Sequence, residues 1–326
     1  MQRFERILVV VDRGMQPSPA LHRGAELARR ASAMLQLCLL DHEPLIDASA
    51  EAVHPEVLQL AKAQFVGKRQ SWLAQQAAAL MDQGLRVDSE VRWAPLPHKA
   101  LLDRVLEHRP DLVIMDFGRS SGHAPRLFAP QDWKAVRLCP APLMLVRPQS
   151  GALPRRIAAA VDTAGDPALT AALNDSIVAA VRQLGLFADA TVHLVHAFPL
   201  RPPSPSGDRS LEAVYEELRQ TDADTFRAFA ARHLFAPERQ HLLTGDPAST
   251  LIDLATRNGF DLIAVGSQYR TAFDRFLLGS TAETVLAQSA CDVLIVKPPQ
   301  FLENLRRHLD IDTLRRRQAL LQVAAA

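Results

Sequence analysis

The chain repeats itself at an offset of 150 residues, and this repeat constrains the fold more than any other feature. The matching segments are RILVVVD (6–12) and RIAAAVD (156–162), DLVIM (111–115) and DLIAV (261–265), LMLVRP (143–148) and VLIVKP (293–298), and Pro97 with Leu101 against Pro247 with Leu251. Four anchors that keep one offset indicate a tandem duplication. A segment rich in proline and glycine, RPQSGALPR (147–155), reads as the linker. We therefore expect one domain at 1–150, a second at 151–298 and a helical tail at 299–326.

Each half alternates short β-rich runs with longer segments of helical periodicity. The β-rich runs are ILVVV, LQLCLL, LRVDSEVRW, LVIM and PLMLV in the first half, and IAAAV, TVHLVHAF, RQHLLT, LIAV and DVLIV in the second. Because most of these runs are apolar at nearly every position, we expect strands of a parallel sheet that helices cover on both faces. Right-handed crossovers then make each half a doubly wound α/β sandwich.

Composition excludes several classes of protein. The 326 residues include 37 Lys and Arg against 36 Asp and Glu, a net charge of +1, which gives no electrostatic footprint for nucleic acid or an anionic membrane. The sequence contains no run of 18 apolar residues, so it predicts no membrane span, and the start of the chain does not resemble a signal peptide. Cys38, Cys139 and Cys291 are an odd, scattered set, which favours buried thiols in a reducing compartment. We expect a cytoplasmic protein that binds neither nucleic acid nor membrane.

The tail has no counterpart at the end of the first half. In the segment 301–323, Leu302, Leu305 and Leu309 fall on one helical face, which predicts an extra helix packed on the body. The basic run 315–317 reads as a solvated face of that helix.

Two strand ends in the second half carry residues suited to a ligand. Asp162 ends the first strand, where its carboxylate could accept hydrogen bonds from an amine or a ribose hydroxyl. The fourth strand runs into GSQYRTAFDRFLLGSTAETVL (266–286), in which Gly279 and Ser280 open the last helix. Backbone N–H groups at a helix start, next to a residue without Cβ, allow a phosphate to approach closely. Arg270 lies in the same loop and could neutralise its charge.

A purely structural interpretation of these residues stays open, in which Gly266 ends a strand and Ser280 caps a helix. The chain contains neither a Walker A pattern nor GxGxxG, which disfavours P-loop and Rossmann chemistry. We find no carboxylate pair, metal-ligand spacing or nucleophile-and-base constellation that predicts a dedicated enzyme. His193 and His196 are three apart in one strand, so they face opposite sides and cannot share a metal.

The segment GSQYRTAFDRFLLGSTAETVL, followed by CDVLIVKP, resembles the universal stress protein signature G-x2-G-x9-G-[ST]. The first half carries FAPQDWKAVRLCPAPLMLV (128–146), which looks like the first domain of the two-domain, E-type members. The resemblance spans residues 4–298. It implies an adenine nucleotide α-hydrolase-like fold with strand order 3-2-1-4-5 in each half, a role in stress survival, and a site in the second half for ATP or another adenine nucleotide.

The resemblance assigns residues of this chain to three parts of the nucleotide site: the adenine side, the contact with the base, and the phosphate and ribose positions. With the loop residues added, the expected site consists of Ala160, Asp162, Ala197, Gly266, Tyr269, Arg270, Gly279, Ser280 and Thr281. Tyr269 departs from the motif, because it stands at the second glycine. A Cβ at a position that requires positive φ costs about 1 kcal/mol or more. The ring would either block the phosphate path or stack on a ligand.

The first half departs further from the motif. At the offset of 150, Asp116, Ala129 and Pro130 replace the two glycines and the serine. Asp116 adds a negative charge where phosphate would lie, and Pro130 removes a backbone donor from the helix start. We predict that this half binds no triphosphate.

Single-domain relatives dimerise through their last strands, so we expect LMLV (143–146) and VLIV (293–296) to pair as a pseudo-dimer inside this chain. The resemblance implies a nucleotide-linked sensor or scaffold that acts on an unknown protein partner, as a monomer or a homodimer. Two alternatives stay open. One is a slow ATPase that uses the same loop, and the other is a stress protein that binds a non-nucleotide small molecule or only protein partners.

Overall fold

A computed structural model describes residues 3–49, 51–117, 130–149, 153–199, 209–267 and 278–307. The strands of the first half are β1 (Arg6–Val11), β2 (Met34–Asp41), β3 (Arg86–Trp93), β4 (Leu112–Asp116) and β5 (Leu143–Val146). Those of the second half are β6 (Arg156–Ala160), β7 (Thr191–Phe198), β8 (Gln240–Thr244), β9 (Leu262–Gly266) and β10 (Asp292–Val296). The helices are α1 (Pro19–Ala31), α2 (Pro44–Ala48), α3 (Pro55–Met81), α4 (Pro97–His108), α5 (Pro130–Leu138), α6 (Pro167–Ala188), α7 (Arg209–Arg232), α8 (Pro247–Asn258) and α9 (Ser280–Gln288).

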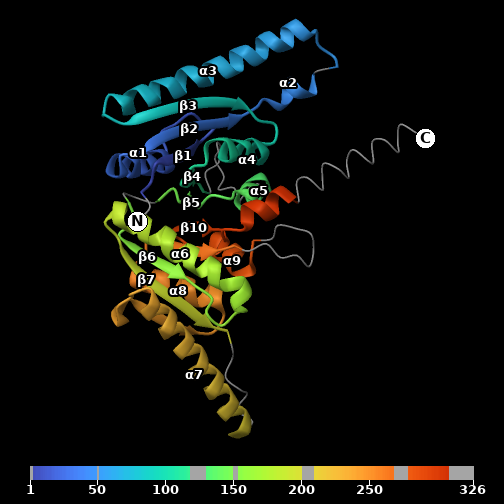
Figure 1. Cartoon of the computed structure of the whole chain (residues 1–326). Helices are drawn as coiled ribbons and strands as arrows, with labels where there is room; N and C mark the ends of the chain where they lie inside the picture. The colour runs from blue at the N-terminus through green and yellow to red at the C-terminus, as the bar shows by residue number, and fades with distance from the viewer. Residues whose placement is uncertain are drawn as a thin grey trace, which may run out of the picture.

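The strands form one sheet in the order β3-β2-β1-β4-β5-β10-β9-β6-β7-β8 (Figure 1). Numbered from the first strand of each half, both halves have the order 3-2-1-4-5, and every pair within a half is parallel. The prediction of two tandem, doubly wound parallel-sheet units is therefore confirmed.

The two halves meet where β5 pairs antiparallel with β10, with Leu143 opposite Ile295 and Leu145 opposite Val293. This pairing confirms the predicted pseudo-dimer within one chain. Val293 and Ile295 point into one hydrophobic core and Leu294 into the other, so the central strands are buried on both faces. Two-sided burial explains why these strands are apolar at successive positions rather than at alternate ones.

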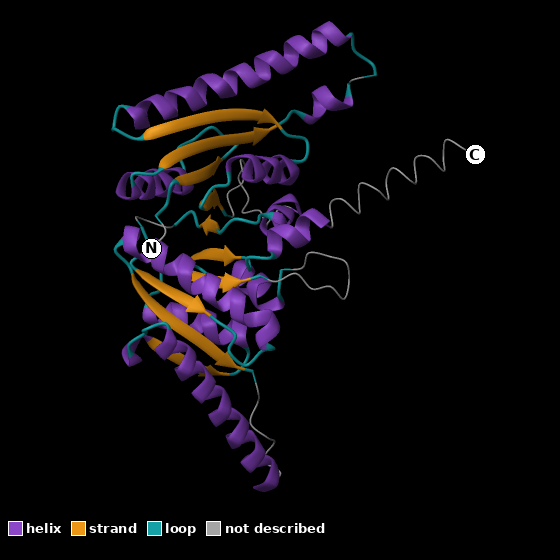
Figure 2. Cartoon of the chain, in the orientation of Figure 1, coloured by secondary structure: helices purple, strands orange, loops and turns teal. Residues whose placement is uncertain are grey.

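Helices cover both faces of the sheet (Figure 2). Residues of α1, α3, α6 and α7 pack into one core, and residues of α4, α5, α8 and α9 pack into the other. The long helices α3 and α7 lie at opposite ends of the sheet (Figure 1). Seven of the helices begin at a proline, the residue whose fixed φ and missing N–H suit the first turn.

The duplication extends to side-chain contacts. Asp111 Oδ2 accepts the backbone N–H groups of Glu5 and Arg6 at 2.7 and 2.9 Å. Asp261, 150 residues later, accepts the backbone N–H groups of Arg155, just before β6, and Arg156, its first residue, at 2.8 and 2.9 Å. Each carboxylate therefore ties the start of its half's first strand to the start of the fourth.

A buried ion pair joins the halves. Arg23 in α1 contacts the carboxylate of Asp292 at the start of β10, and their side chains are 3% and 0% exposed. Asp292 Oδ1 also accepts the backbone N–H of Arg147, which follows β5, at 2.8 Å. The counterparts of Arg23 and Asp292 at the offset of 150 are Leu173 and Pro142, so this pair has no symmetric copy.

The start of the tail packs on the first half. Residues 301–307 are helical, and buried Phe301 and Leu305 form a small cluster with Leu102 of α4. The later tail residues named above, Leu309 among them, lie outside the described residues. In the described part of the chain, no helix has the length and hydropathy to cross a membrane.

Candidate functional site

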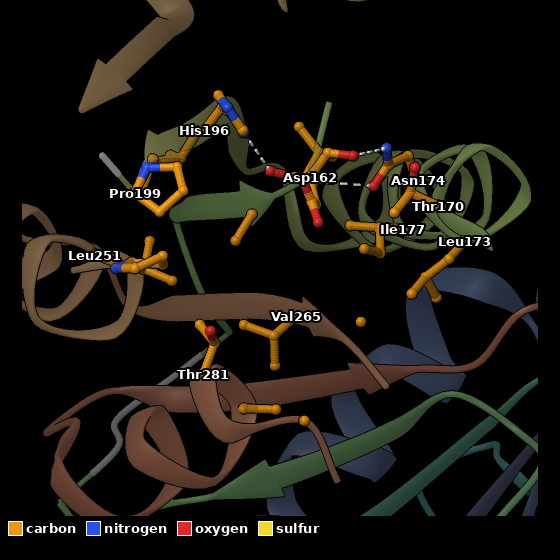
Figure 3. A pocket seen from close by; sticks show the side chains of 18 of the residues that line it. Asp162, Thr170, Leu173, Asn174, Ile177, His196, Pro199, Leu251, Val265 and Thr281 are labelled. Atoms are coloured by element: carbon orange, nitrogen blue, oxygen red, sulfur yellow. Dashed lines mark hydrogen bonds between the residues drawn. The ribbon is translucent and has the colours of Figure 1, made fainter. Parts of the chain in front are cut away.

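A cavity of about 260 Å³ opens at the carboxyl ends of β6, β7 and β9, the point where the strand order of the second half changes direction (Figure 3). Ligands of open parallel sheets bind at such a switch point. Seven of the nine expected residues line this cavity: Ala160, Asp162, Ala197, Gly266, Gly279, Ser280 and Thr281. The other two, Tyr269 and Arg270, lie outside the described residues.

The backbone of Asp162 is held from α6. Its N–H donates to Asn174 Oδ1 at 3.1 Å, and the Asn174 side-chain amide donates back to its carbonyl at 2.7 Å (Figure 3). One carboxylate oxygen of Asp162 accepts the N–H of Gly165 at 2.9 Å. The residue itself is exposed, so its carboxylate stays accessible from the cavity. This double hydrogen bond fixes the turn after β6 from which that carboxylate projects.

His196 forms part of the wall beside this turn. Its Nδ1 lies 3.0 Å from the Val161 carbonyl, and its Nε2 lies 3.0 and 2.9 Å from the two carboxylate oxygens of Asp222 in α7. The side chains of His196 and Asp222 are 3% and 5% exposed. The imidazole therefore joins α7 to the strand ends that line the cavity.

Gly266 allows close packing at the end of β9. A Cβ added there would lie 2.5 Å from Leu173 Cδ2 and 3.1 Å from Ile177 Cδ1, and both of these α6 side chains line the cavity. The contact with Leu173 is too short for any side chain at position 266 unless Leu173 moves. The glycine is therefore explained by packing as well as by access to the cavity.

Gly279 is the N-cap residue of α9, with no side chain to cap the helix. Among the described residues, no atom lies within 4 Å of the position that a Cβ would take. Ser280 and Thr281 follow in the first turn and line the same cavity. Helix N-termini attract anions because their N–H groups and dipole point outward.

The corresponding part of the first half is built differently. Asp116 Oδ1 accepts the backbone N–H of Ala20 at the start of α1, at 3.1 Å. Gly24 stands where the second half has Asn174, and a Cβ there would lie 2.3 Å from Val9 Cγ2. The first half thus lacks a side-chain amide like that of Asn174, which holds the turn at Asp162 in the second half. The Asp116 carboxylate instead accepts a hydrogen bond from the start of α1.

Sequence reasoning missed the residues that α6, α7 and α8 bring to the cavity or behind its wall. These are Thr170, Leu173, Asn174 and Ile177 in α6, Asp222 in α7, and Pro247 and Leu251 in α8. One signal was readable in the sequence, because Asn174 is a polar residue on an otherwise apolar helix face. Leu173, Ile177 and Leu251 are ordinary core types, whose place at a cavity depends on three-dimensional packing.

Histidine and cysteine side chains away from this cavity make structural contacts. His193 does not meet His196; its Nδ1 lies 2.9 Å from Nε2 of His241, and burial lowers the pKa of His193 to about 4. Burial raises the pKa of Cys38 to about 12 and that of Cys139 to about 11, so both stay thiols at neutral pH. Within the described ranges, no group of three or more His, Cys, Asp and Glu side chains could hold a metal ion.

Comparison with known proteins agrees with this architecture. The model of the universal stress protein family matches residues 3–147 and again 154–297. The chain is 27% identical to universal stress protein E of Escherichia coli (strain K12), over 92% of this chain and 96% of that protein. Two crystal structures from Pseudomonas aeruginosa share the fold at 22% identity. Protein PA1789, of unknown function, has a TM-score of 0.70 and covers 93% of this chain and 96% of its own. A putative universal stress protein has a TM-score of 0.68 and covers 93% and 97%. With both halves matched by the family model, the chain belongs to the universal stress protein family.

Proposed function

We propose that the second half binds an adenine nucleotide in the cavity at its strand ends, and that the protein is a cytoplasmic stress-response sensor or scaffold. One observation carries this proposal: the polar turn at Asp162 and the open helix start at Gly279 line the same cavity. These two features suit opposite parts of a nucleotide, the first a hydrogen-bond donor and the second an anion.

The lining supports a nucleoside with phosphate. The apolar side chains of Ile177, Leu251 and Val265 offer a surface for a base. The carboxylate of Asp162 accepts hydrogen bonds from an exocyclic amine or a ribose hydroxyl, and the N-terminus of α9 receives phosphate. A volume of about 260 Å³ lies near the ~300 Å³ lower end of small-molecule sites, which suits a mononucleotide better than a larger cofactor.

Isothermal titration calorimetry with ATP, ADP and AMP tests the proposal, using wild-type protein, Gly279→Glu and Gly67→Glu. Gly279→Glu puts a carboxylate at the helix start that would receive phosphate. Gly67→Glu is the matched control, because Gly67 lies in α3, away from the cavity, and its Cβ position is equally open.

We expect wild type and Gly67→Glu to bind nucleotide at one site per chain, and Gly279→Glu to lose binding. No binding at millimolar nucleotide, or binding unchanged in Gly279→Glu, would refute the site. Linear, magnesium-dependent release of phosphate from ATP that disappears in Ser280→Ala would instead assign a slow ATPase.

A further inference from the structure

A second cavity, of about 720 Å³, lies between the two halves. It is lined from the first half by the end of α4 and the segment before β5, and from the second half by α6, the end of β10 and the start of the tail. This volume falls within the ~300–1,000 Å³ of small-molecule sites, and cavities between domains are frequent ligand sites.

Most of the cavity wall is apolar. Five of the 19 lining residues are prolines, and seven more are alanine, valine or leucine. Because a proline has no backbone N–H, these five residues offer a ligand no main-chain donor. A sugar or another ligand with many hydroxyl groups would lose hydrogen bonds to water here, whereas an aliphatic chain would gain from leaving water. The wall therefore favours a ligand with an aliphatic body.

Five charged residues line the cavity, and partners outside it hold two of them. Arg182 donates a hydrogen bond to the His233 carbonyl, and its guanidinium lies 5.1 Å from the centre of the Phe235 ring. The Nζ of Lys297 donates to Ser267 Oγ at 2.7 Å. Since His233, Phe235 and Ser267 do not line the cavity, these two cationic groups are engaged outside it.

The other three charged residues are Arg109, Arg306 and Asp111. Among the described residues, neither of these two arginines has a partner in a hydrogen bond or an ion pair. Asp111 Oδ2 accepts the backbone N–H groups of Glu5 and Arg6 at 2.7 and 2.9 Å, and its negative charge offsets one guanidinium. Two positive charges against one negative charge suit a ligand with a single negative charge and disfavour a dianion.

Arg109 differs from its counterpart in the second half. It caps the C-terminus of α4 with a φ of 44°, a left-handed conformation that is disfavoured for a residue with a Cβ. The counterpart at the offset of 150 is Gly259, with a φ of 62°, and glycine adopts this conformation at no steric cost. The first half thus has a cationic side chain at a position where the backbone favours glycine.

We propose that this cavity binds an aliphatic carboxylate, as a second ligand site that does not depend on the nucleotide cavity. The aliphatic chain lies against the apolar wall, and the carboxylate pairs with Arg109 and Arg306. A guanidinium binds a carboxylate through two parallel N–H groups. Each methylene that the wall removes from water strengthens binding about fourfold. Because both halves contribute to the wall, the bound molecule contacts both of them.

Isothermal titration calorimetry of the full chain with octanoate, decanoate and 1-octanol tests the proposal. We expect octanoate to bind at one site per chain, and decanoate to bind about tenfold more tightly because it buries two more methylenes. 1-Octanol has the same chain as octanoate without the charge, so it should bind about tenfold more weakly than octanoate. No binding of decanoate at millimolar concentration, or 1-octanol binding as tightly as octanoate, would overturn the proposal.

A double variant tests the two arginines. Arg109→Gly with Arg306→Gln removes both charges, and the glycine copies Gly259 and suits the left-handed backbone. We expect this variant to bind octanoate about tenfold more weakly and to bind 1-octanol as wild type does. Arg257→Gln is the matched control, because Arg257 is an exposed arginine of α8 outside the cavity. Unchanged octanoate binding, or equal weakening of octanoate and 1-octanol, would refute the pairing of the carboxylate with these arginines.

A variant that fills the cavity tests its location. Ala179 is an exposed residue of α6 that lines the cavity, so Ala179→Trp places a large side chain there without disturbing the core. Ala171→Trp is the matched control, because Ala171 is exposed on the same helix and lines neither cavity. We expect Ala179→Trp to lose binding of octanoate and decanoate, and Ala171→Trp to keep it. If decanoate binds Ala179→Trp as tightly as wild type, the carboxylate sits elsewhere and the proposal is wrong.

Discussion

The buried ion pair between Arg23 and Asp292 gives a prediction about how the halves stay together. In Arg23→Met, the Asp292 carboxylate loses its guanidinium partner while it stays fully buried. Removing one member of a buried ion pair typically costs about 3–5 kcal/mol, because a buried charge is left behind. We expect Arg23→Met to lower the free energy of unfolding by that amount.

The double variant Arg23→Met with Asp292→Asn separates this effect from lost packing. An asparagine removes the charge but keeps an oxygen that can accept the N–H of Arg147, now at 2.8 Å from Asp292. Neutralising both partners avoids the stranded charge, so we expect the double variant to recover at least about 2 kcal/mol of the loss. Such recovery in a double-mutant cycle would show that the two side chains act as a pair.

Urea unfolding followed by circular dichroism measures the four proteins of the cycle: wild type, Arg23→Met, Asp292→Asn and the double variant. Arg29→Met is the matched control, because Arg29 lies in the same helix and pairs with Glu26 at the surface, with side chains 43% and 36% exposed. Exposed pairs contribute about 0–1 kcal/mol. If Arg23→Met costs no more than Arg29→Met, the electrostatic reasoning is wrong and the pair does not hold the halves together.

Three further predictions concern packing and pH. Gly266→Ala should lower the free energy of unfolding by about 1–3 kcal/mol, because its Cβ would lie 2.5 Å from Leu173 Cδ2. Gly67→Ala should show no packing penalty, because no described atom lies within 4 Å of its Cβ position, and urea unfolding midpoints compare the two variants. Burial holds the pKa of His193 near 4 in the folded protein, so between pH 6.5 and 4 the unfolded chain binds more protons. Stability should then fall by roughly 2 kcal/mol as pH drops through this window, and His193→Leu should flatten the curve. The lowered pKa of Lys297 predicts that stability rises from pH 7 towards 10.5, by at most about 1.4 kcal/mol per pH unit, and thermal unfolding of Lys297→Met should lack this rise.

Much of the fold was predictable because it depends on repetition and on strand composition. The offset of 150 residues and the apolar runs predicted two tandem parallel-sheet units, whereas the strand order of each half and the pairing of β5 with β10 came from the resemblance to the universal stress protein family. These features are written locally in the chain, as runs of residue types and as identical spacings.

The contacts that make the halves unequal were not predictable. Arg23 and Asp292 are 269 residues apart, and nothing in either neighbourhood marks them as partners. Asn174 could have been noticed as a polar residue on an apolar helix, but its two hydrogen bonds to Asp162 depend on how α6 lies against β6. Such contacts follow from packing between distant segments, which local patterns do not encode.

The antiparallel pairing of β5 with β10 has a thermodynamic consequence. When two separate chains pair their last strands, the association depends on protein concentration. Here the short segment between β5 and β6 ties the partners together, and short tethers give effective concentrations in the millimolar range. The paired state therefore persists however dilute the protein becomes. Because neither half has to match a copy of itself, the second half can keep Gly266 at the end of β9 while the first half has Asp116 at the equivalent position, where its carboxylate accepts the N–H of Ala20.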